Sequence, residues 1–393
     1  MTTYRVDLKV ARELHRFGAF DIDACFNCGN CTAICHHSTE SASFPRRLIR
    51  YGQLGMRERL LAAREVWLCW NCRDCSDTCP RKARPSEYVE AARRYAIASL
   101  DPSGISRLMY TSSAFVVVFA LALAALLAGV LLSQASIPPD GPLALFVFIP
   151  FELIHNLGIL VLVLVGLLAL FNLYRLVGRI YGAFTPPSEE STTPPATRTP
   201  LSAAAAATRA LVDEMARQDR FRQCEVEAER PWFLRPWFVH YAIMWGFIGL
   251  GLATALDFLF KVPGSMVPLW YPPRLLGTIA GLALMYGSSV TILRKLRPVD
   301  ETQARPLASD WLFLGLLFAV GLSGFLLEVM VYLPRVGSFG YATFVFHVAL
   351  AMELLVLLPF TKFAHALYRP LAYWIYHFRL ARAAQSSAIE ASD

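Results

Sequence analysis

Two runs of four cysteines near the N-terminus limit what this chain can fold into more than any other feature. Both runs read C-x2-C-x2-C-x3-C, and Pro80 directly follows the second. Three closely spaced cysteines followed by a fourth are typical of a 4Fe–4S cluster. The alternative is a pair of structural zinc sites, but those are usually built from isolated C-x2-C pairs. The spacing therefore predicts two 4Fe–4S clusters.

In two-cluster ferredoxins with this spacing, the fourth cysteine of each run ligates the other cluster. We therefore predict two crossed ligand sets, which are Cys25, Cys28, Cys31 and Cys79 for one cluster and Cys69, Cys72, Cys75 and Cys35 for the other. His36 and His37 stand where the first run would normally carry a proline, so either one is placed to tune the potential of the nearby cluster. This use of eight of the nine cysteines leaves Cys224, which we interpret as an ordinary reduced thiol.

The sequence between the two cysteine runs predicts helices rather than strands. Its apolar residues, such as Leu48, Ile49, Leu60 and Leu61, recur at helical spacing. Small bacterial ferredoxins use short strands in the same place, so this region is closer to an α-helical ferredoxin. We predict an all-α chain that begins with a cytoplasmic α-helical dicluster ferredoxin domain at residues 1–109.

Beyond residue 109 the sequence is too apolar for an ordinary soluble protein, and hydrophobic residues make up 55% of the whole chain. Most of them fall into long runs, six of which are long enough to cross a bilayer as helices. The predicted spans are residues 110–132, 146–177, 237–260, 275–293, 311–333 and 340–368. The count predicts a six-helix transmembrane bundle.

Basic residues are sorted to one side of this predicted bundle. Of the 37 Lys and Arg residues, 32 lie before the first span, in the loops after the second and fourth spans, or after the sixth span. The loops on the other side hold only Lys261, Arg274 and Arg335. By the positive-inside rule, the clusters and both termini face the cytoplasm from the inner membrane. The net charge of +7 is thus explained by a membrane, and we expect no nucleic-acid partner.

The loop after the second span is long and has two parts. A Pro- and Thr-rich segment at 185–200 is typical of a disordered linker, and an Ala-rich stretch at 201–222 predicts a helix. The predicted units of the chain are the ferredoxin domain at 1–109, transmembrane helices at 110–177, a cytoplasmic linker at 178–236, transmembrane helices at 237–368 and a cytoplasmic tail at 369–393.

Four of the eight histidines lie inside predicted spans, where an imidazole is costly without a partner or a metal. His347 and His365 are 18 residues apart on the last span, which is five helical turns, so they would share one face at depths about 27 Å apart. The predicted topology puts His155 level with His347, and His240 level with His365. We therefore predict an outer b haem on the first pair and an inner b haem on the second. In the alternative, one pair is structural and a single haem remains.

Carboxylates inside the spans are candidates for quinone chemistry, which needs proton acceptors beside the quinone ring. Glu152, Asp257 and Glu328 lie near the outer side of the predicted bundle, and Glu353 lies deeper in the last span. Our candidate for the quinone site is Glu328, although Asp257 and Glu328 are also close enough to the interface to be ordinary solvated carboxylates. Glu152 precedes His155 by three residues, so the alternative role of Glu152 is to orient the His155 ring as a haem ligand.

Several segments of the first domain are similar to a known family. Residues 25–35, 44–47, 53–55 and 67–72 resemble the C subunit of heterodisulfide reductase. The membrane part is similar to the cytochrome b subunit of respiratory nitrate reductase, which also carries two haem-ligating histidines on its last span. The fused arrangement resembles the C subunit of the quinone-interacting membrane-bound oxidoreductase.

This resemblance implies a membrane-anchoring subunit that passes electrons between a quinone, either menaquinone or ubiquinone, and cytoplasmic flavin and iron–sulfur subunits of the heterodisulfide reductase A type. It implies adenylylsulfate reductase as the eventual partner, in sulfur-compound energy metabolism. The sequence has no glycine-rich dinucleotide fingerprint, so we expect the substrate-converting centre on another polypeptide. Two alternatives stay open. One is an anchor for a heterodisulfide reductase-like or electron-transfer-flavoprotein:quinone complex, and the other is a transporter with a metal-stabilised cytoplasmic domain.

Overall fold

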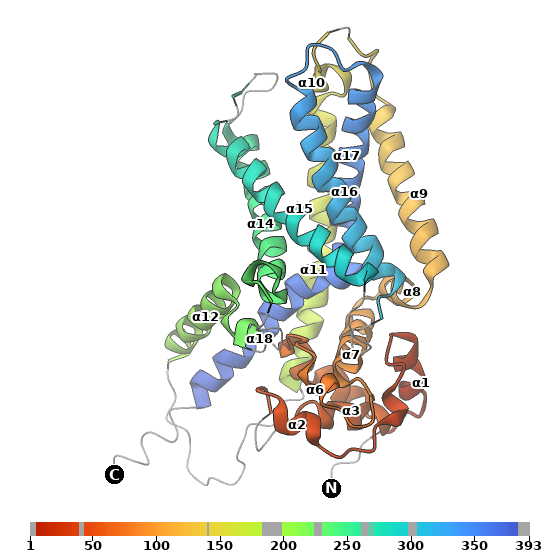
Figure 1. The fold of residues 1–393 in the computed structure, drawn as a ribbon, viewed down its shortest axis with the longest axis vertical. Helices are drawn as coiled ribbons and strands as arrows, with labels where there is room; N and C mark the ends of the chain where they lie inside the picture. Colours follow the sequence, from red (N-terminus) through yellow and green to blue (C-terminus); the bar gives the residue numbers. More distant parts are fainter. Residues whose placement is uncertain are drawn as a thin grey trace.

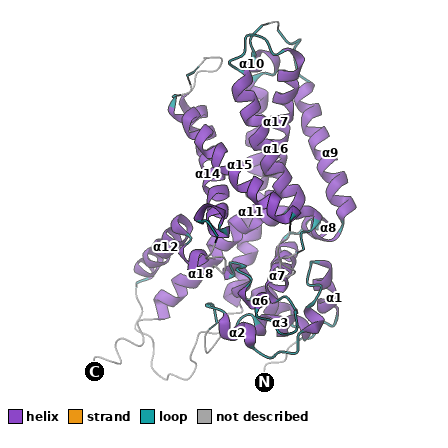
Figure 2. Cartoon of the chain, in the orientation of Figure 1, coloured by secondary structure: helices purple, strands orange, loops and turns teal. Residues whose placement is uncertain are grey.

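The computed structural model describes residues 5–38, 43–139, 141–182, 199–223, 230–260, 267–268, 270–297 and 305–383. Within these ranges the regular elements are all helices and no β-strand occurs (Figure 2). Long helices form a bundle, with a domain of short helices at one end and α10 (Leu145–Phe148) at the other (Figure 1). The predicted all-α fold class is confirmed.

The N-terminal domain consists of short helices because the two cysteine loops interrupt the chain repeatedly. Its core contains fully buried side chains such as Leu14, Ile49, Trp67 and Tyr88. The segment between the cysteine runs is helical, as its apolar spacing predicts. The helices are α1 (Lys9–Arg16), η1 (Ile22–Ala24), α2 (Asn30–Ile34), α3 (Arg46–Gln53), α4 (Arg57–Ala62), α5 (Glu65–Leu68), α6 (Asp74–Asp77), α7 (Pro85–Leu100) and α8 (Ile105–Thr111).

Six described helices are long and apolar enough to cross a membrane, in agreement with the predicted number. They are α9 (Ser113–Leu132), α11 (Phe151–Gly182), α14 (Pro236–Phe260), α15 (Pro272–Leu296), α16 (Ala308–Met330) and α17 (Gly337–Leu357). Their outward faces are apolar, and on α11 the side chains of Leu160, Leu164 and Leu167 are more than half exposed. Such a surface is unfavourable in water and suits hydrocarbon. The chain is therefore a multi-pass membrane protein.

The prediction of a single last span at 340–368 is wrong. After α17 the chain forms η3 (Leu358–Phe360), η4 (Lys362–Ala364) and α18 (His365–Ala383). Pro359 has no N–H with which to continue α17, and Thr361 between the two turns is extended, with a φ of −117°. His347 and His365 consequently lie on different helices, so their spacing of 18 residues does not give them a common face. The predicted tail is helical through the end of α18.

The long loop after α11 is helical where the structure describes it. It contains α12 (Pro200–Arg217) and α13 (Asp219–Gln223), at the position of the helix predicted at 201–222. Gln218 separates them with a φ of 54°, which turns the chain sharply. α12 packs along α18, so it is not a free surface helix. Nearly all of the predicted linker at 185–200 lies outside the described residues, and so does Cys224.

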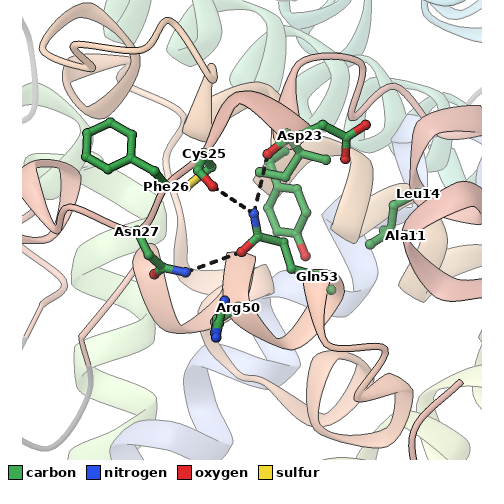
Figure 3. Close-up of a pocket in the computed structure, with 11 residues that line it drawn as sticks. Ala11, Leu14, Asp23, Cys25, Phe26, Asn27, Arg50 and Gln53 are labelled. Atoms are coloured by element: carbon green, nitrogen blue, oxygen red, sulfur yellow. Dashed lines mark hydrogen bonds between the residues drawn. The ribbon is translucent and has the colours of Figure 1, made fainter. Parts of the chain in front are cut away.

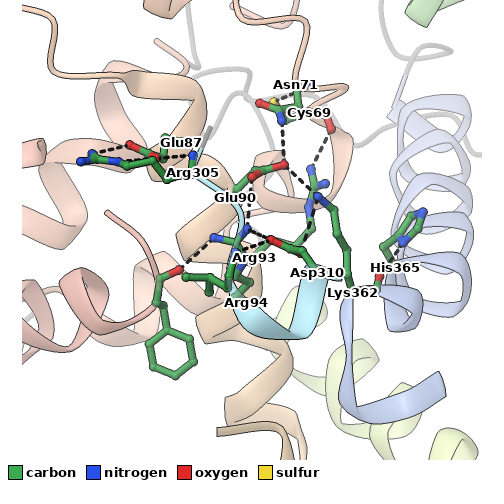
Figure 4. Close-up of polar contacts among 12 residues, drawn as sticks. Cys69, Asn71, Glu87, Glu90, Arg93, Arg94, Arg305, Asp310, Lys362 and His365 are labelled. Carbon is green, nitrogen blue, oxygen red and sulfur yellow. Dashed lines mark hydrogen bonds and ion pairs between the residues drawn. The ribbon is translucent and has the colours of Figure 1, made fainter. Parts of the chain in front are cut away.

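A buried group of charged side chains joins the N-terminal domain to the membrane helices (Figure 4). Arg94 of α7 lies 2.9 Å from Asp310 of α16 and 3.3 Å from Glu90, and the Arg94 and Asp310 side chains are only 5% and 2% exposed. Lys362 of η4 lies 3.1 Å from Glu90. Burial alone would raise the pKa of Glu90, but the positive charges of Lys362 and Arg94 outweigh burial and hold its pKa well below its usual range. Glu90 therefore stays ionised between two cations.

Two further contacts hold α7 against the membrane helices. Arg305, just before α16, donates to Glu87 of α7 at 3.1 Å. Arg179 of α11 donates to the carbonyl of Ser99 near the end of α7 at 2.8 Å. Three segments of the membrane part thus contact α7 of the N-terminal domain. They are α11, the start of α16 with the residues just before it, and η4. These contacts fix the position of the cysteine loops relative to the membrane helices.

We expect Arg94→Met, which keeps the aliphatic stem, to destabilise the N-terminal domain by about 3–5 kcal/mol, because it leaves Asp310 buried without its principal cation. Arg107→Met is the matched control, since Arg107 is 47% exposed and its partner Glu13 also contacts Arg57. We expect the control to cost less than about 1 kcal/mol. Denaturant titration of the detergent-solubilised protein, followed by cluster absorbance, measures both. An equal loss of stability in the two variants would contradict a special role for the buried ionic contacts of Arg94.

Candidate functional site

The structure gathers the eight cysteines of the two runs into two cavities, each lined by three cysteines of one run and one of the other. The first cavity is lined by Cys25, Cys28, Cys31 and Cys79, and the second by Cys69, Cys72, Cys75 and Cys35. These groupings match the predicted ligand sets. The crossing arises because α2 and α6 pack against each other, so that the cysteine after each helix reaches the other loop. Ligation of iron by these residues stays a prediction.

The two cysteine loops share one backbone conformation. Asn27 and Asn71, which precede the second cysteine of each run, have φ values of 66° and 60°. Gly29 and Arg73, which follow that cysteine, have φ values of 91° and 78°. Left-handed residues at alternate positions curl a loop so that its N–H groups converge, and the Asn71 N–H lies 3.3 Å from Cys69 Sγ. The internal repeat therefore extends from the cysteine spacing to the local structure.

The geometry of these cavities suits a cluster better than a zinc ion. A tetrahedral zinc site, with Zn–S bonds near 2.3 Å, would bring its sulfurs within about 4 Å of one another. In the described part of the chain, no three His, Cys, Asp or Glu side chains converge in the manner of ligands to one metal ion. A cubane cluster instead gives each thiolate its own iron, so the sulfurs lie farther apart.

The buried thiols also need a cation to ionise. Burial raises the pKa of Cys35 to about 12 and raises the pKa of Cys75 well above its usual value, with the other cysteines of the second cavity contributing. Burial raises the pKa of Cys31 in the first cavity in the same way. Thiolates are the form that binds iron, and the positive charge of the metal offsets this cost. The donor set therefore fits an iron–sulfur cluster in each cavity.

Gln53 of α3 holds the first cysteine loop beside a hollow of about 690 Å³ (Figure 3). Its Nε2 donates to the carbonyls of Cys25 at 3.1 Å and Ile22 at 3.5 Å. Its Oε1 accepts from Asn27 Nδ2 at 3.3 Å. One side chain thus fixes the loop on both sides of its first cysteine.

His240 and His365 lie together at the end of the bundle nearest the second cavity. Their ring centroids are 6.2 Å apart. His240 Nδ1 lies 3.1 Å from Gln218 Oε1, and His365 Nδ1 lies 2.5 Å from the carbonyl of Lys362. Both acceptors require a proton on Nδ1, so each Nε2 keeps its lone pair. Imidazole nitrogen is an ordinary ligand of haem iron, so His240 and His365 would be able to hold a haem through their Nε2 atoms.

The predicted outer pair is not brought into contact. His155 stacks on Phe258 of α14, with a centroid separation of 4.0 Å. His347 Nδ1 lies 2.9 Å from Ser323 Oγ. The His347 ring also faces Gly324, and a Cβ atom added to that glycine would lie 3.1 Å from the ring. Among the described residues no ring contact joins the two histidines. The structure therefore supports the inner pair more directly than the outer one.

The carboxylates of the spans differ sharply in their surroundings. Glu328 lies 3.4 Å from Arg274 Nε and accepts a hydrogen bond from Thr278 at 2.9 Å, so it is already paired. Glu353 is buried, and its Oε1 has no hydrogen-bond partner in the described chain. Glu152 is exposed and lines an open hollow of about 760 Å³ near the start of α11. The pairing of Glu328 suits a structural role better than proton transfer.

Two residues of the site have no signal in the sequence. Gln218 contacts His240 only because the turn between α12 and α13 comes back to α14. Arg93 of α7 donates to the carbonyls of Cys69 at 2.7 Å and Val66 at 2.8 Å, which fixes the second loop from behind. Neither contact follows from a spacing, because each joins elements that are distant in the chain.

Comparison with known proteins bears on the N-terminal domain. Residues 21–83 match the family of the 4Fe-4S dicluster domain. The C subunit of the H(2):CoB-CoM heterodisulfide,ferredoxin reductase of Methanothermobacter thermautotrophicus is 28% identical over 91 residues, which are 23% of this chain and 49% of that protein. A protein of Archaeoglobus profundus that is named as similar to the C subunit of heterodisulfide reductase is 33% identical over 109 residues, which are 26% of this chain and 58% of that protein.

The iron–sulfur C subunit of the CoB--CoM heterodisulfide reductase of Methanopyrus kandleri is 33% identical over 75 residues, or 19% of this chain and 39% of that protein. The chain thus spans about half the length of the curated relatives it matches. No solved structure matches it. The predicted resemblance is confirmed for the first domain: residues 21–83 match a 4Fe–4S dicluster domain, and the surrounding segment is similar to the heterodisulfide reductase C subunit.

Proposed function

We propose that this chain is the membrane-anchoring electron-transfer subunit of a quinone-linked oxidoreductase. In this role it passes electrons between a membrane quinone and cytoplasmic partner subunits. The observation that carries the proposal is the His240–His365 pair, two imidazoles 6.2 Å apart beside the second cysteine cavity. When bound, b haems and two 4Fe–4S clusters would supply the one-electron carriers.

The side chains around the inner pair are suited to holding a haem. Gln218 and the carbonyl of Lys362 fix the tautomer and the orientation of the His240 and His365 rings. A hydrogen bond at one ring nitrogen also makes the other nitrogen a better metal ligand. His240 and His365 would therefore bind iron through Nε2, with little reorganisation of either ring.

We extend the proposal to a second b haem on His155 and His347. Both α11 and α17 begin at the end of the bundle far from the cysteine loops, which supports a second site at another depth (Figure 1). Gly324 supports it too, because the absence of a side chain there leaves room beside the His347 ring. This second site requires His155 to leave its stacking position on Phe258.

For the quinone, we favour the hollow at the start of α11 over Glu328. Its wall combines apolar side chains, such as Leu153, Leu157 and Leu160, with the polar groups of Glu152 and Asn156. Apolar walls with a few polar groups are typical of small-molecule sites, and a carboxylate is able to exchange a proton with the quinone ring. The hollow also lies one helical turn from His155, so a quinone there would be close to the outer haem site.

The partners follow from the first domain. The names of the relatives denote subunits of heterodisulfide reductases, which supports cytoplasmic flavin and iron–sulfur subunits of that type as partners. The predicted fused arrangement supports adenylylsulfate reductase as the eventual partner, and an electron-transfer flavoprotein is the alternative. The distribution of basic residues supports a cytoplasmic N-terminal domain. Co-purification from native membranes with mass spectrometry distinguishes these partners.

We expect about eight iron atoms per chain, from two four-iron clusters. Cys79→Ser should damage the cluster of the first cavity, and Cys35→Ser, the matched variant, should damage that of the second. Paramagnetic resonance of both variants in reduced protein measures this. If Cys79→Ser removed the signal of the cluster on Cys69, Cys72 and Cys75, the crossed ligation would be excluded.

We expect His240→Ala and His365→Ala each to remove one b haem, because an axial site with two imidazoles loses half its protein ligands in either variant. His377→Ala is the control, since His377 lies on the same helix as His365 but packs on Tyr373 and Tyr376. Haem quantification and redox titration of the purified protein measure the loss. Retention of the full haem content in either test variant would refute the inner site, and the absence of b-type bands in the unsubstituted protein would favour the transporter alternative.

We expect Glu152→Gln to slow haem reduction by added quinol without loss of haem, because the hollow keeps its shape but loses its carboxylate. Glu328→Gln should leave that rate nearly unchanged and lower the stability by roughly 1–3 kcal/mol, because Arg274 loses its ion-pair partner in a half-buried setting. Stopped-flow absorbance at the haem bands gives the rates. If Glu328→Gln slowed haem reduction and Glu152→Gln did not, the quinone site would instead lie at Glu328.

A further inference from the structure

A chain of aromatic contacts leads from the second cysteine cavity to the inner histidine pair. Trp70, between Cys69 and Cys72, lines the cavity. Its ring is stacked on Phe221 of α13, with centroids 5.2 Å apart and an interplanar angle of 7°. Phe221 in turn meets the His240 ring edge to face, at 5.9 Å and 84°. Only two ring contacts therefore separate the cavity wall from His240.

The same helix that carries His365 also holds Trp70 in place. Arg369 follows His365 by four residues, which is about one turn of α18. Its guanidinium lies 3.3 Å from the centroid of the Trp70 ring and donates to the carbonyl of Leu68 at 3.3 Å. A cation over an indole is a favourable contact, and here it ties the second cysteine loop to the helix of a candidate haem ligand.

The first cysteine loop lacks this arrangement. Phe26 is the counterpart of Trp70, because both follow the first cysteine of their run and precede an asparagine in left-handed conformation. The Phe26 side chain is 61% exposed, and Arg81 lies 5.9 Å from its centroid. Two loops with the same backbone thus differ in whether their aromatic residue is packed against another part of the chain.

We propose that Trp70, with Phe221, is the contact through which single electrons pass between the inner haem site and the cluster of the second cavity. This inference rests on the proposed haem at His240 and His365. In one direction a haem held by this pair would be oxidised by one electron and a cluster in the second cavity would be reduced by that electron; the reverse direction exchanges these roles. No bond forms or breaks and no proton moves. Trp70 is a positioning residue that closes the gap and stays in its own redox state.

A second connection runs through polar groups, but it is less direct (Figure 4). It passes from the His365 ring to the carbonyl of Lys362, along the Lys362 side chain to Glu90, and then through Asn71 to Cys69. This path needs four polar contacts and the full length of two side chains, those of Lys362 and Asn71, because both meet the same Glu90 Oε1 atom. Tunnelling weakens with every added bond and gap, so the aromatic contacts form the shorter route.

The test uses the full chain in its native complex, with Trp70→Leu and Phe221→Leu as variants and Phe26→Leu as the matched control. Rapid reduction of the haem, followed by stopped-flow absorbance and freeze-quench paramagnetic resonance of the cluster, gives the rate of transfer. We expect both test variants to slow transfer severalfold, because leucine removes a ring contact and leaves a gap that the electron must cross. Haem content, cluster content and both potentials should remain those of the unsubstituted protein.

The control and the conservative variant decide the interpretation. Phe26→Leu should transfer at the unsubstituted rate, and Trp70→Phe should recover most of the rate lost in Trp70→Leu, because a stacked ring is restored. An unchanged rate of electron transfer in Trp70→Leu, with the haem and the cluster both present, would overturn the inference and leave the proposed function intact. Absence of a haem from the unsubstituted protein would overturn both.

Discussion

The buried contact of Arg94 with Asp310 and Glu90 is the interaction on which the rest of this structure depends. It joins a helix of the cysteine domain to the start of a membrane helix, and Lys362 extends it to the turn that precedes His365. Removing charges from water is costly, so such a group is tolerated only when every member is paired. The consequence is that the orientation of this domain relative to the membrane helices is specified by directional ionic contacts as well as by apolar packing.

Much of the cysteine domain was predictable because its information is local. The spacing of each run defines a loop of fixed length. Asn or Gly occupies three of the four left-handed positions, where such a backbone costs little, and Arg73 occupies the fourth. The crossed grouping of Cys35 and Cys79 was also predictable, because the same spacing has the same consequence in other two-cluster domains. The number of membrane helices followed from the length of the apolar runs and needed no tertiary information.

The arrangement of the histidines was predictable only in part. The inner pairing of His240 with His365 followed from depth alone, yet the expectation of a single helix carrying both His347 and His365 was wrong. A proline near the end of a long apolar run is often tolerated in a membrane helix, so Pro359 did not by itself indicate a break. The contacts of Gln218 and Phe221 could not be foreseen, because they depend on how the loop after α11 folds back on the bundle.

The break before α18 has a structural use that a continuous helix would not offer. The two turns redirect the chain, so α18 leaves the bundle and packs against α5 and α12. His365 at its first residue stays beside His240, while Arg369 one turn later reaches Trp70 in the cysteine domain. A straight extension of α17 would keep these residues along the bundle axis. The ionic contact through Lys362 lies within the same turn, so one short segment fixes both the domain and the distance between the two candidate redox sites.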